Sequence, residues 1–216
     1  MYIRKDHRLD DRDALFALMA RHPLGAWVCQ DGDGGLVANH LPFVLDRDRG
    51  PHGTLIGHVS RANGVWRALG RGAPSVVMFQ GPQAYITPGW YPGKAAHGQV
   101  VPTWNYAVVH AHGEARAIDD RDWLLAMLER LTEAQEAGHA QPWRVGDAPA
   151  GFIDSLVRAI VGIEIPIARL EGKLKASQDE APEDRRGTVQ GLRQSADGAA
   201  REMGRLVQQA LEADSV

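Results

Sequence analysis

The chain has 216 residues, of which 24 are Lys or Arg and 27 are Asp or Glu, so its formal net charge is -3. With 44% hydrophobic and 24% charged residues, its composition is typical of a soluble globular protein. The weakly acidic balance lacks the overall positive charge that most nucleic-acid-binding domains carry.

Cys29 is the single cysteine, which excludes an intrachain disulfide and a cysteine-built zinc or iron–sulfur site within this chain. No apolar run approaches the ~20 residues that span a bilayer. The charged first residues, 1–8, have no apolar segment behind them and do not resemble a secretory signal. We therefore expect a cytoplasmic protein that does not contact membranes.

Taken in chain order, the apolar patterns predict a helix over 11–21 and a hairpin of strands over 24–30 and 36–45, then a strand over 54–59. The other expected elements are a short helix over 61–69 capped by Ser60, a strand over 75–87 interrupted at Gly81-Pro82, a loop over 87–94, a strand over 101–118, helices over 122–137 and 149–161, a strand over 163–170 and a helical tail from Pro182. About six strands joined by short turns, with helices near the start, middle and end, indicate a small antiparallel barrel.

The expected strand over 101–118 has two unequal faces, because successive side chains of a strand alternate. The bulky face carries Trp104, Tyr106, Val108, His110 and His112, and the small face carries Thr103, Asn105, Ala107, Val109, Ala111 and Gly113. A small face allows a ligand or a partner subunit to approach closely, whereas a bulky face can fill an interior. The pattern leaves open which face does which.

The two histidines of that strand are a candidate metal pair, but a catalytic metal normally takes three protein ligands. No third ligand is identified by spacing, so we predict no metal site and interpret His110 and His112 as structural residues.

The residues from His58 to Asn63 could hold a phosphate. The N-terminus of a helix presents free N–H groups, to which Ser60 adds a hydroxyl, Asn63 an amide, and Arg61 and Arg67 positive charges. The same residues also fit an ordinary capped helix with solvated arginines, and both interpretations remain open.

Two other polar groups have open alternatives. Asn39 lies on an apolar strand face, where an amide without partners costs about 1–3 kcal/mol, so it bonds either a neighbouring backbone or a bound heterocycle. Lys173 and Lys175 share a face near Ser177 and Gln178, and they form either a solvated sheet edge or a pair that meets a phosphate or a carbonyl.

No nucleophile elbow, Cys–His signature or helix-turn-helix with a basic second helix occurs in the chain. The carboxylates are scattered, so no acid–base pair is assigned and the catalytic residues stay unknown.

Several longer motifs follow one another in a fixed order. They are LVANHLPF (36–43), GHVSRAN (57–63) with Trp66, FQGPQAYI (79–86), Trp90-Tyr91, VPTWNY (101–106) and IPIARLEGK (165–173). Together they resemble the PaiB family of FMN-binding negative transcriptional regulators, over residues 1–178.

The resemblance implies an antiparallel split β-barrel with peripheral helices, related to pyridoxamine 5′-phosphate oxidase. It also implies a homodimer with FMN at the subunit interface. Residues 1–178 would form the FMN-binding domain, and 179–216 a helical C-terminal extension that packs on the barrel or on the partner subunit. DNA is a partner by this resemblance alone, since the charge of the chain does not support it.

The resemblance also implies roles for individual residues. The phosphate would lie near Ser60, Arg61 and Asn63, with Asn39 and His40 along the flavin. The full set of implied cofactor-binding residues is Asn39, His40, His58, Ser60, Arg61, Asn63, Trp66, Trp104, Asn105, Lys173 and Gln178. Trp104 and Asn105 would line the groove, and Lys173 and Gln178 would close it.

The chain departs from the family's usual pattern at Gly89, Leu174 and Asp179, where the family tends to have Ser, Trp and Asn. Losing an aromatic surface and adding a negative charge would both weaken flavin binding. The alternative functions are a flavin-dependent oxidoreductase of the pyridoxamine 5′-phosphate oxidase-like class and a haem-binding split-barrel protein.

Overall fold

The computed structural model describes residues 1–70 and 72–214. The chain forms two compact units, each assembled from separate segments. Unit 1 comprises residues 1–18, 80–109 and 171–216, and unit 2 comprises residues 19–79 and 110–170. The long strands β6 (Ala73–Ile86), β7 (Thr103–Ile118) and β8 (Ile160–Lys175) contribute residues to both units.

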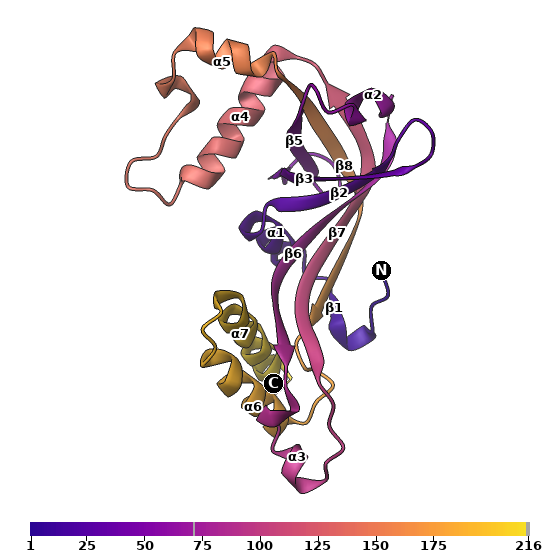
Figure 1. Ribbon diagram of the computed structural model, residues 1–216, viewed down its shortest axis with the longest axis vertical. Helices are drawn as coiled ribbons and strands as arrows, with labels where there is room; N and C mark the ends of the chain where they lie inside the picture. Colours follow the sequence, from indigo (N-terminus) through magenta and orange to yellow (C-terminus); the bar gives the residue numbers. More distant parts are fainter. Residues whose placement is uncertain (71, 215–216) are drawn as a thin grey trace. The chain divides into compact units, whose positions relative to one another are not determined.

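Unit 2 is built on a sheet whose strands follow the order β3-β2-β6-β7-β8-β5-β4. Its shorter strands are β2 (Leu24–Gln30), β3 (Leu36–Pro42), β4 (Val44–Asp46) and β5 (Thr54–Ser60). The predicted hairpin is present as β2 and β3, which pair antiparallel with Trp27 opposite Asn39 (Figure 1). The pairs β2–β6, β4–β5 and β5–β8 are also antiparallel, which agrees with the predicted class of sheet.

The helices of unit 2 are α2 (Val65–Ala68), α4 (Arg121–Glu136) and α5 (Ala150–Val157), with the short 3-10 turn η3 (Val145–Asp147). Asp120 caps α4 by accepting a hydrogen bond from the Trp123 N–H at 2.8 Å. Leu124 and Met127 of α4 are buried with Ile56 of β5 and Val157 of α5. This cluster fixes α4 and α5 on the sheet of unit 2.

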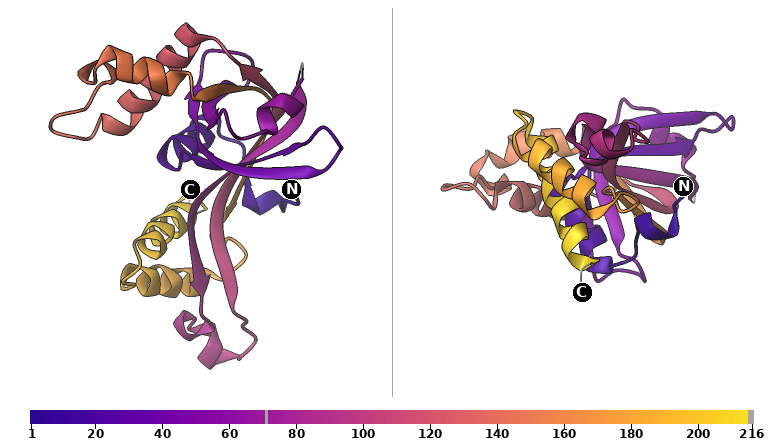
Figure 2. Two further views of the ribbon diagram at one scale, coloured as in Figure 1. Left: turned by 45° about the horizontal axis from the view of Figure 1, so that its top comes forward. Right: turned by 90° about the horizontal axis from the view of Figure 1, so that it is seen from below.

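Unit 1 contains η1 (Lys5–His7), β1 (Arg8–Leu9), η2 (Pro88–Trp90), α3 (Gly93–Ala96), α6 (Pro182–Arg193) and α7 (Gly198–Ala213). The remaining helix, α1 (Arg12–Arg21), has residues in both units. The strand β1 pairs antiparallel with the end of β8, with Arg8 opposite Lys173. The predicted helical tail is thus a pair of helices, α6 and α7, which lie side by side (Figures 1 and 2).

The helix predicted over 61–69 with Ser60 as its cap is wrong. Ser60 belongs to β5 and pairs with Ile160 of β8, so the ladder continues through it. The helix α2 begins only at Val65, whose N–H is bonded by the side chain of Asn63 at 3.1 Å. A four-residue helix that starts five residues later gives Ser60 no helix N-terminus to share.

The strand predicted to break at Gly81-Pro82 is continuous in β6. A Cβ added at Gly81 would lie 3.2 Å from the carbonyl oxygen of Ala107, so glycine allows β7 to approach closely there. The predicted helix over 149–161 ends earlier, at Val157, because Ile160 and Val161 join the ladder with β5. Ile160 and Val161 are β-branched, and β-branched residues favour a strand over a helix.

The two faces of β7 are now distinguished. Asn105, Ala107, Val109 and Ala111 are at most 1% exposed, whereas Trp104 is 53% exposed. The small face is therefore the interior face, where neighbouring elements must come close. A Cβ added at Gly113 would lie 2.2 Å from the carbonyl oxygen of Pro166 in β8, which shows how close the approach is.

None of the helices in the described part of the chain combines the length and the apolar character that crossing a bilayer requires.

Candidate functional site

The residues that the motifs single out fall into two groups, one in each unit. Unit 2 holds Asn39, His40, His58, Ser60, Arg61, Asn63 and Trp66, and unit 1 holds Trp104, Asn105, Lys173 and Gln178. Each group has contacts of its own.

In unit 2, the hairpin and the turn after β5 bring Asn39 and Asn63 together. The Nδ2 of Asn63 donates to the Oδ1 of Asn39 at 2.7 Å, while its Oδ1 accepts from Val65. The half-buried Asn39 therefore has an amide side chain as its partner, not a neighbouring backbone. Its own Nδ2 is buried and has no hydrogen-bond partner within the described residues.

Arg61 is held tightly within unit 2. Its guanidinium makes four hydrogen bonds, to both carboxylate oxygens of Asp119 at 2.5 and 2.9 Å and to the carbonyl oxygens of Arg158 and Ile160. A guanidinium has five N–H donors, so little of its capacity remains for a phosphate. The ion pair raises the pKa of Arg61 and lowers that of Asp119, chiefly through the hydrogen bonds between them. Arg61 thus fixes the turn after β5.

Arg67 is the cation of this turn that stays available. Its guanidinium lies over the ring of Trp66 at 4.5 Å, and it forms no ion pair with a carboxylate in residues 1–70 or 72–214. Trp66 is itself oriented by its Nε1, which donates to the carbonyl oxygen of Arg61 at 3.0 Å. The exposed hydroxyl of Ser60 accepts from the Ala62 N–H at 3.3 Å. The turn therefore offers a hydroxyl and a guanidinium to an anion.

The two histidines of this group differ in environment. His40 is exposed on β3, whereas His58 on β5 is half-buried. Burial lowers the pKa of His58 below its usual 6.5, and its Nδ1 is buried without a hydrogen-bond partner in the described structure. The neutral ring of His58 can therefore offer that nitrogen to a ligand.

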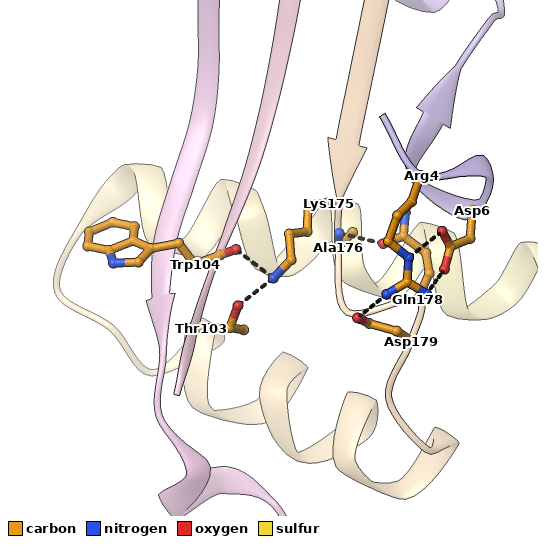
Figure 3. Close-up of polar contacts among 8 residues, drawn as sticks. All are labelled: Arg4, Asp6, Thr103, Trp104, Lys175, Ala176, Gln178 and Asp179. Atoms are coloured by element: carbon orange, nitrogen blue, oxygen red, sulfur yellow. Dashed lines mark hydrogen bonds and ion pairs between the residues drawn. The ribbon is translucent and has the colours of Figure 1, made fainter. Parts of the chain in front are cut away.

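In unit 1, the side chains of Asn105 and Gln178 form hydrogen bonds that hold the end of β8 and the turn after it. Asn105 is fully buried and its Nδ2 donates to the hydroxyl of Ser177 at 2.8 Å. Gln178 accepts from the Ala176 N–H at 2.6 Å (Figure 3). It also donates to the Leu174 carbonyl oxygen at 2.7 Å. Both amides hold the turn in which Ser177 has a positive φ of 59°. They support the surface beside them.

That surface contains a pocket of about 340 Å³, which we call the β7–β8 pocket. It is lined by Tyr2, Arg4, His7, Thr103, Trp104, Tyr106, Lys173, Lys175 and Asp179. The ammonium of Lys175 donates to the hydroxyl of Thr103 and, at 3.0 Å, to the carbonyl oxygen of Trp104 (Figure 3). The ammonium of Lys173 lies 5.0 Å from the ring centroid of Tyr106. Of the residues that the motifs implied in unit 1, Trp104 and Lys173 line this pocket.

Sequence reasoning missed Arg4, His7 and Tyr106 as members of this pocket. Arg4 and His7 come from the first residues of the chain, which β1 places beside the end of β8. No local pattern marks them. Tyr106 could have been found, because it shares the bulky face of β7 with Trp104.

The two departures near the end of β8 have local explanations. Leu174 packs against a buried cluster that includes Tyr91 and Leu192, so it faces the interior while Lys173 and Lys175 face the pocket. An aromatic residue at 174 would therefore not line the pocket. The carboxylate of Asp179 forms an ion pair with Arg4 at 3.1 Å, which offsets its negative charge.

Residues 1–169 match the protein family described as "Putative FMN-binding domain". The chain belongs to this family. FMN, the cofactor implied by the motifs, is thereby confirmed as the cofactor of this chain. The match includes all the implied residues except Lys173 and Gln178, which lie beyond residue 169.

Relatives of this FMN-binding chain match it over most of their length. An uncharacterized protein of Emericella nidulans is 33% identical over 226 residues, covering 89% of this chain and 90% of the relative. Protease synthase and sporulation protein PAI 2 of Bacillus subtilis is 27% identical over 212 residues, covering 98% of this chain and 99% of the relative. The predicted resemblance to the PaiB family is confirmed.

Among solved structures, the FAD and heme binding protein from Mycobacterium smegmatis superposes with a TM-score of 0.59 at 22% identity, covering 82% of this chain and 78% of that one. At this identity the likeness concerns the fold, and it confirms the predicted antiparallel split barrel with helices.

The residues present fit FMN, which carries a phosphate, a ribityl chain and a flat ring system. In unit 2, the unpartnered nitrogens of Asn39 and His58 suit a polar ligand, and Arg67 suits a phosphate. In unit 1, Lys173 and Lys175 lie beside the aromatic side chains of the β7–β8 pocket. When bound, FMN supplies the redox chemistry, and the protein orients it and controls access to it.

Proposed function

We propose that this chain is a PaiB-type, FMN-binding negative transcriptional regulator that works in the cytoplasm as a homodimer with the flavin at the subunit interface. The observation that supports this best is the turn after β5, where Ser60 and Arg67 offer a hydroxyl and a cation to a phosphate and Asn63 joins the turn to Asn39. The full-length similarity to PAI 2, whose name refers to protease synthesis and sporulation, supports a regulatory role.

In this proposal, Asn39 and His58 meet the ribityl chain or the flavin through their unpartnered nitrogens, and exposed His40 of β3 also contacts the cofactor. Arg61 holds the turn through Asp119, and the guanidinium of Arg67 stacks on the ring of Trp66 at 4.5 Å. Residues 1–178 form the flavin domain, and the helices of 179–216 are an extension that packs on the barrel or on the partner subunit.

A second copy of this chain is the proposed occupant of the exposed aromatic face of unit 1. Tyr85 is 49% and Trp104 53% exposed, and their rings meet edge to face with centroids 6.1 Å apart. Aromatic side chains are enriched at protein interfaces. Light scattering of the purified protein tests this: we expect a dimer of the 23.6 kDa chain, and a monomer at micromolar concentration would contradict it.

FMN titration followed by flavin absorbance and fluorescence tests the phosphate contact. We expect Arg67→Met to weaken FMN about tenfold, since a hydrogen bond to a charged group contributes on the order of 1.5–3 kcal/mol. Riboflavin, which has no phosphate, should bind both proteins equally. Arg116→Met is the matched control, because Arg116 is an exposed arginine of the same unit outside this turn. An equal loss for FMN and riboflavin would remove Arg67 from the phosphate site.

A salt-dependent DNA titration of the purified, FMN-loaded protein tests the regulatory role. Specific binding to a fragment from its own promoter region, tighter than to random duplex of equal length, is the expected result. Equal affinity for both duplexes would exclude direct operator recognition and would leave a flavoprotein that acts by other means.

A further inference from the structure

We infer that the β7–β8 pocket of unit 1 is an anion site, which takes a phosphate or carboxylate group of a small molecule between Lys173, Lys175 and His7. The residues of this site belong to unit 1, whereas the phosphate contacts proposed above belong to unit 2. The inference rests on the proposed function only for the source of the anion, which is either the phosphate of FMN or an anionic effector bound separately.

The first evidence for an anion site is the excess of positive charge in the lining of the pocket. Three cationic side chains line it, those of Arg4, Lys173 and Lys175, against the single carboxylate of Asp179. That carboxylate is already paired with Arg4, at 3.1 Å. Neither lysine forms an ion pair with any carboxylate of the described chain. Two ammonium groups in one hollow, neither ion-paired with a carboxylate, favour an anion between them.

The hydrogen bonds of the two lysines also leave capacity for a ligand. Lys175 donates to neutral oxygens of Thr103 and Trp104, and Lys173 donates to the carbonyl oxygen of Tyr2 at 3.4 Å. An ammonium has three N–H donors, so Lys175 retains one and Lys173 two. The existing hydrogen bonds already fix the positions of the two ammonium groups. This lowers the entropic cost of ordering these side chains when a ligand binds.

His7 adds a second, independent indication. It lines the pocket, is only 3% exposed, and its buried Nε2 has no hydrogen-bond partner within the described residues. Leaving such a nitrogen unpaired costs free energy, and an acidic ligand in the pocket would offer a partner. Burial lowers the pKa of His7, while the charges that face it are Asp6 and Asp179 against Arg4 and Lys175. An added anion would therefore favour its protonated form.

The size and walls of the pocket limit the ligand. A volume of about 340 Å³ lies at the small end of ligand sites, which run from roughly 300 to 1,000 Å³. Tyr2, Trp104 and Tyr106 provide aromatic surface beside the cations. The ligand expected in this pocket is thus a small molecule with a compact anionic group attached to a flat or apolar part.

Binding of inorganic phosphate to the full-length protein, freed of flavin and measured by calorimetry in a chloride buffer, tests the site directly. We expect Lys173→Met and Lys175→Met each to weaken phosphate about tenfold, as for loss of a charge-assisted hydrogen bond. Lys94→Met is the matched control, because Lys94 is an exposed lysine of unit 1 outside the pocket. Because Lys175 also holds β7, His7→Gln is a further variant, expected to weaken phosphate binding and to abolish proton uptake on binding.

Competition identifies the source of the anion. If FMN displaces phosphate and riboflavin does not, the pocket holds the phosphate of FMN, and the phosphate contact proposed for Arg67 in unit 2 is wrong. If FMN-loaded protein still binds phosphate, the pocket takes a separate anionic ligand. No phosphate binding by the unmodified protein, or equal binding by the lysine variants, would overturn the anion site. Failure to bind FMN would refute the proposed function and leave this test intact.

Discussion

The guanidinium of Arg4 lies 3.1 Å from the carboxylate of Asp179, and it joins the first residues of the chain to the turn after β8. Arg4 also pairs with Asp6 at 2.7 Å. The Asp6 hydrogen bond and charge, with a smaller contribution from Asp179, raise the pKa of Arg4. The acidic residue at 179, which departs from the family pattern, is thus matched by a cation from a distant segment.

Arg4→Met should therefore weaken anion binding in the β7–β8 pocket through the uncompensated charge of Asp179. We expect roughly a threefold loss of affinity for phosphate, because exposed ion pairs are weak. The double variant Arg4→Met/Asp179→Asn should recover most of the loss, since Asn at 179 carries no charge. Calorimetric titration of both variants checks this. A double variant that binds phosphate no better than Arg4→Met would contradict it.

The helical tail shows how packing outweighs the low helix propensity of glycine. Four glycines weaken a helix prediction, yet α6 and α7 both form. A Cβ at Gly191 would lie 2.3 Å from the ring of Trp90, and one at Gly187 would lie 2.0 Å from the carbonyl oxygen of Trp90. These glycines let η2 pack directly on the backbone of α6, so their cost in helix propensity is offset by packing.

Gly191→Ala should destabilise the protein by about 1–3 kcal/mol, as expected when a methyl group is forced into a packed contact. Gly198→Ala, at the start of α7, is the control: its nearest neighbour is a flexible Arg201 atom 3.8 Å away. That variant should leave the free energy of unfolding unchanged or raise it slightly. Urea denaturation measures both. A stabilised Gly191 variant would show that Trp90 is not packed on α6.

Local patterns predicted the hairpin of β2 and β3, the helix α4 and the alternation of β7, because each depends on neighbours within one segment. The motif resemblance brought Asn39 and Asn63 into one site, and their 2.7 Å hydrogen bond agrees with that grouping. These features follow from short-range periodicity or from recognisable strings of residues.

Long-range pairing decided the rest. Ser60 suits a helix cap locally, but its pairing with Ile160 keeps it in the sheet. Arg4 and His7 enter the β7–β8 pocket only because β1 pairs with the end of β8, more than 160 positions along the chain. The sequence leaves Arg61 open as a phosphate ligand or a solvated arginine, whereas its bonds to Asp119 commit it to the turn after β5. No single window of the sequence contains these partners.

The buried guanidinium of Arg185 on α6 depends on Asp214, to which it donates at 2.6 Å. The side chain of Arg185 is 4% exposed, and its Nε and second terminal nitrogen have no partner among the residues described. Asp214→Asn should cost about 1–2 kcal/mol, because it leaves a buried charge with less compensation, while the partly exposed position of Asp214 limits the loss. Arg185→Met, which removes the charge itself, should cost less. The reverse order in urea denaturation would show that the pair is net stabilising.

Stability should decrease as the pH falls below about 6.5, because burial lowers the pKa of both His58 and His7. As the pH falls below 6.5, these histidines bind protons in the unfolded chain but not yet in the folded chain. The stability that they contribute above pH 6.5 is therefore lost as the pH falls from 6.5 to the lowered pKa values of the folded state. The pKa values of Asp46 and Asp119 are lowered from 3.8, chiefly by hydrogen bonds from arginines, so these carboxylates stay ionised throughout this range. Free energies of unfolding between pH 8 and 5 should therefore fall for the unmodified protein and fall less for His58→Gln and His7→Gln. An identical decrease in both variants would assign the pH dependence to other groups.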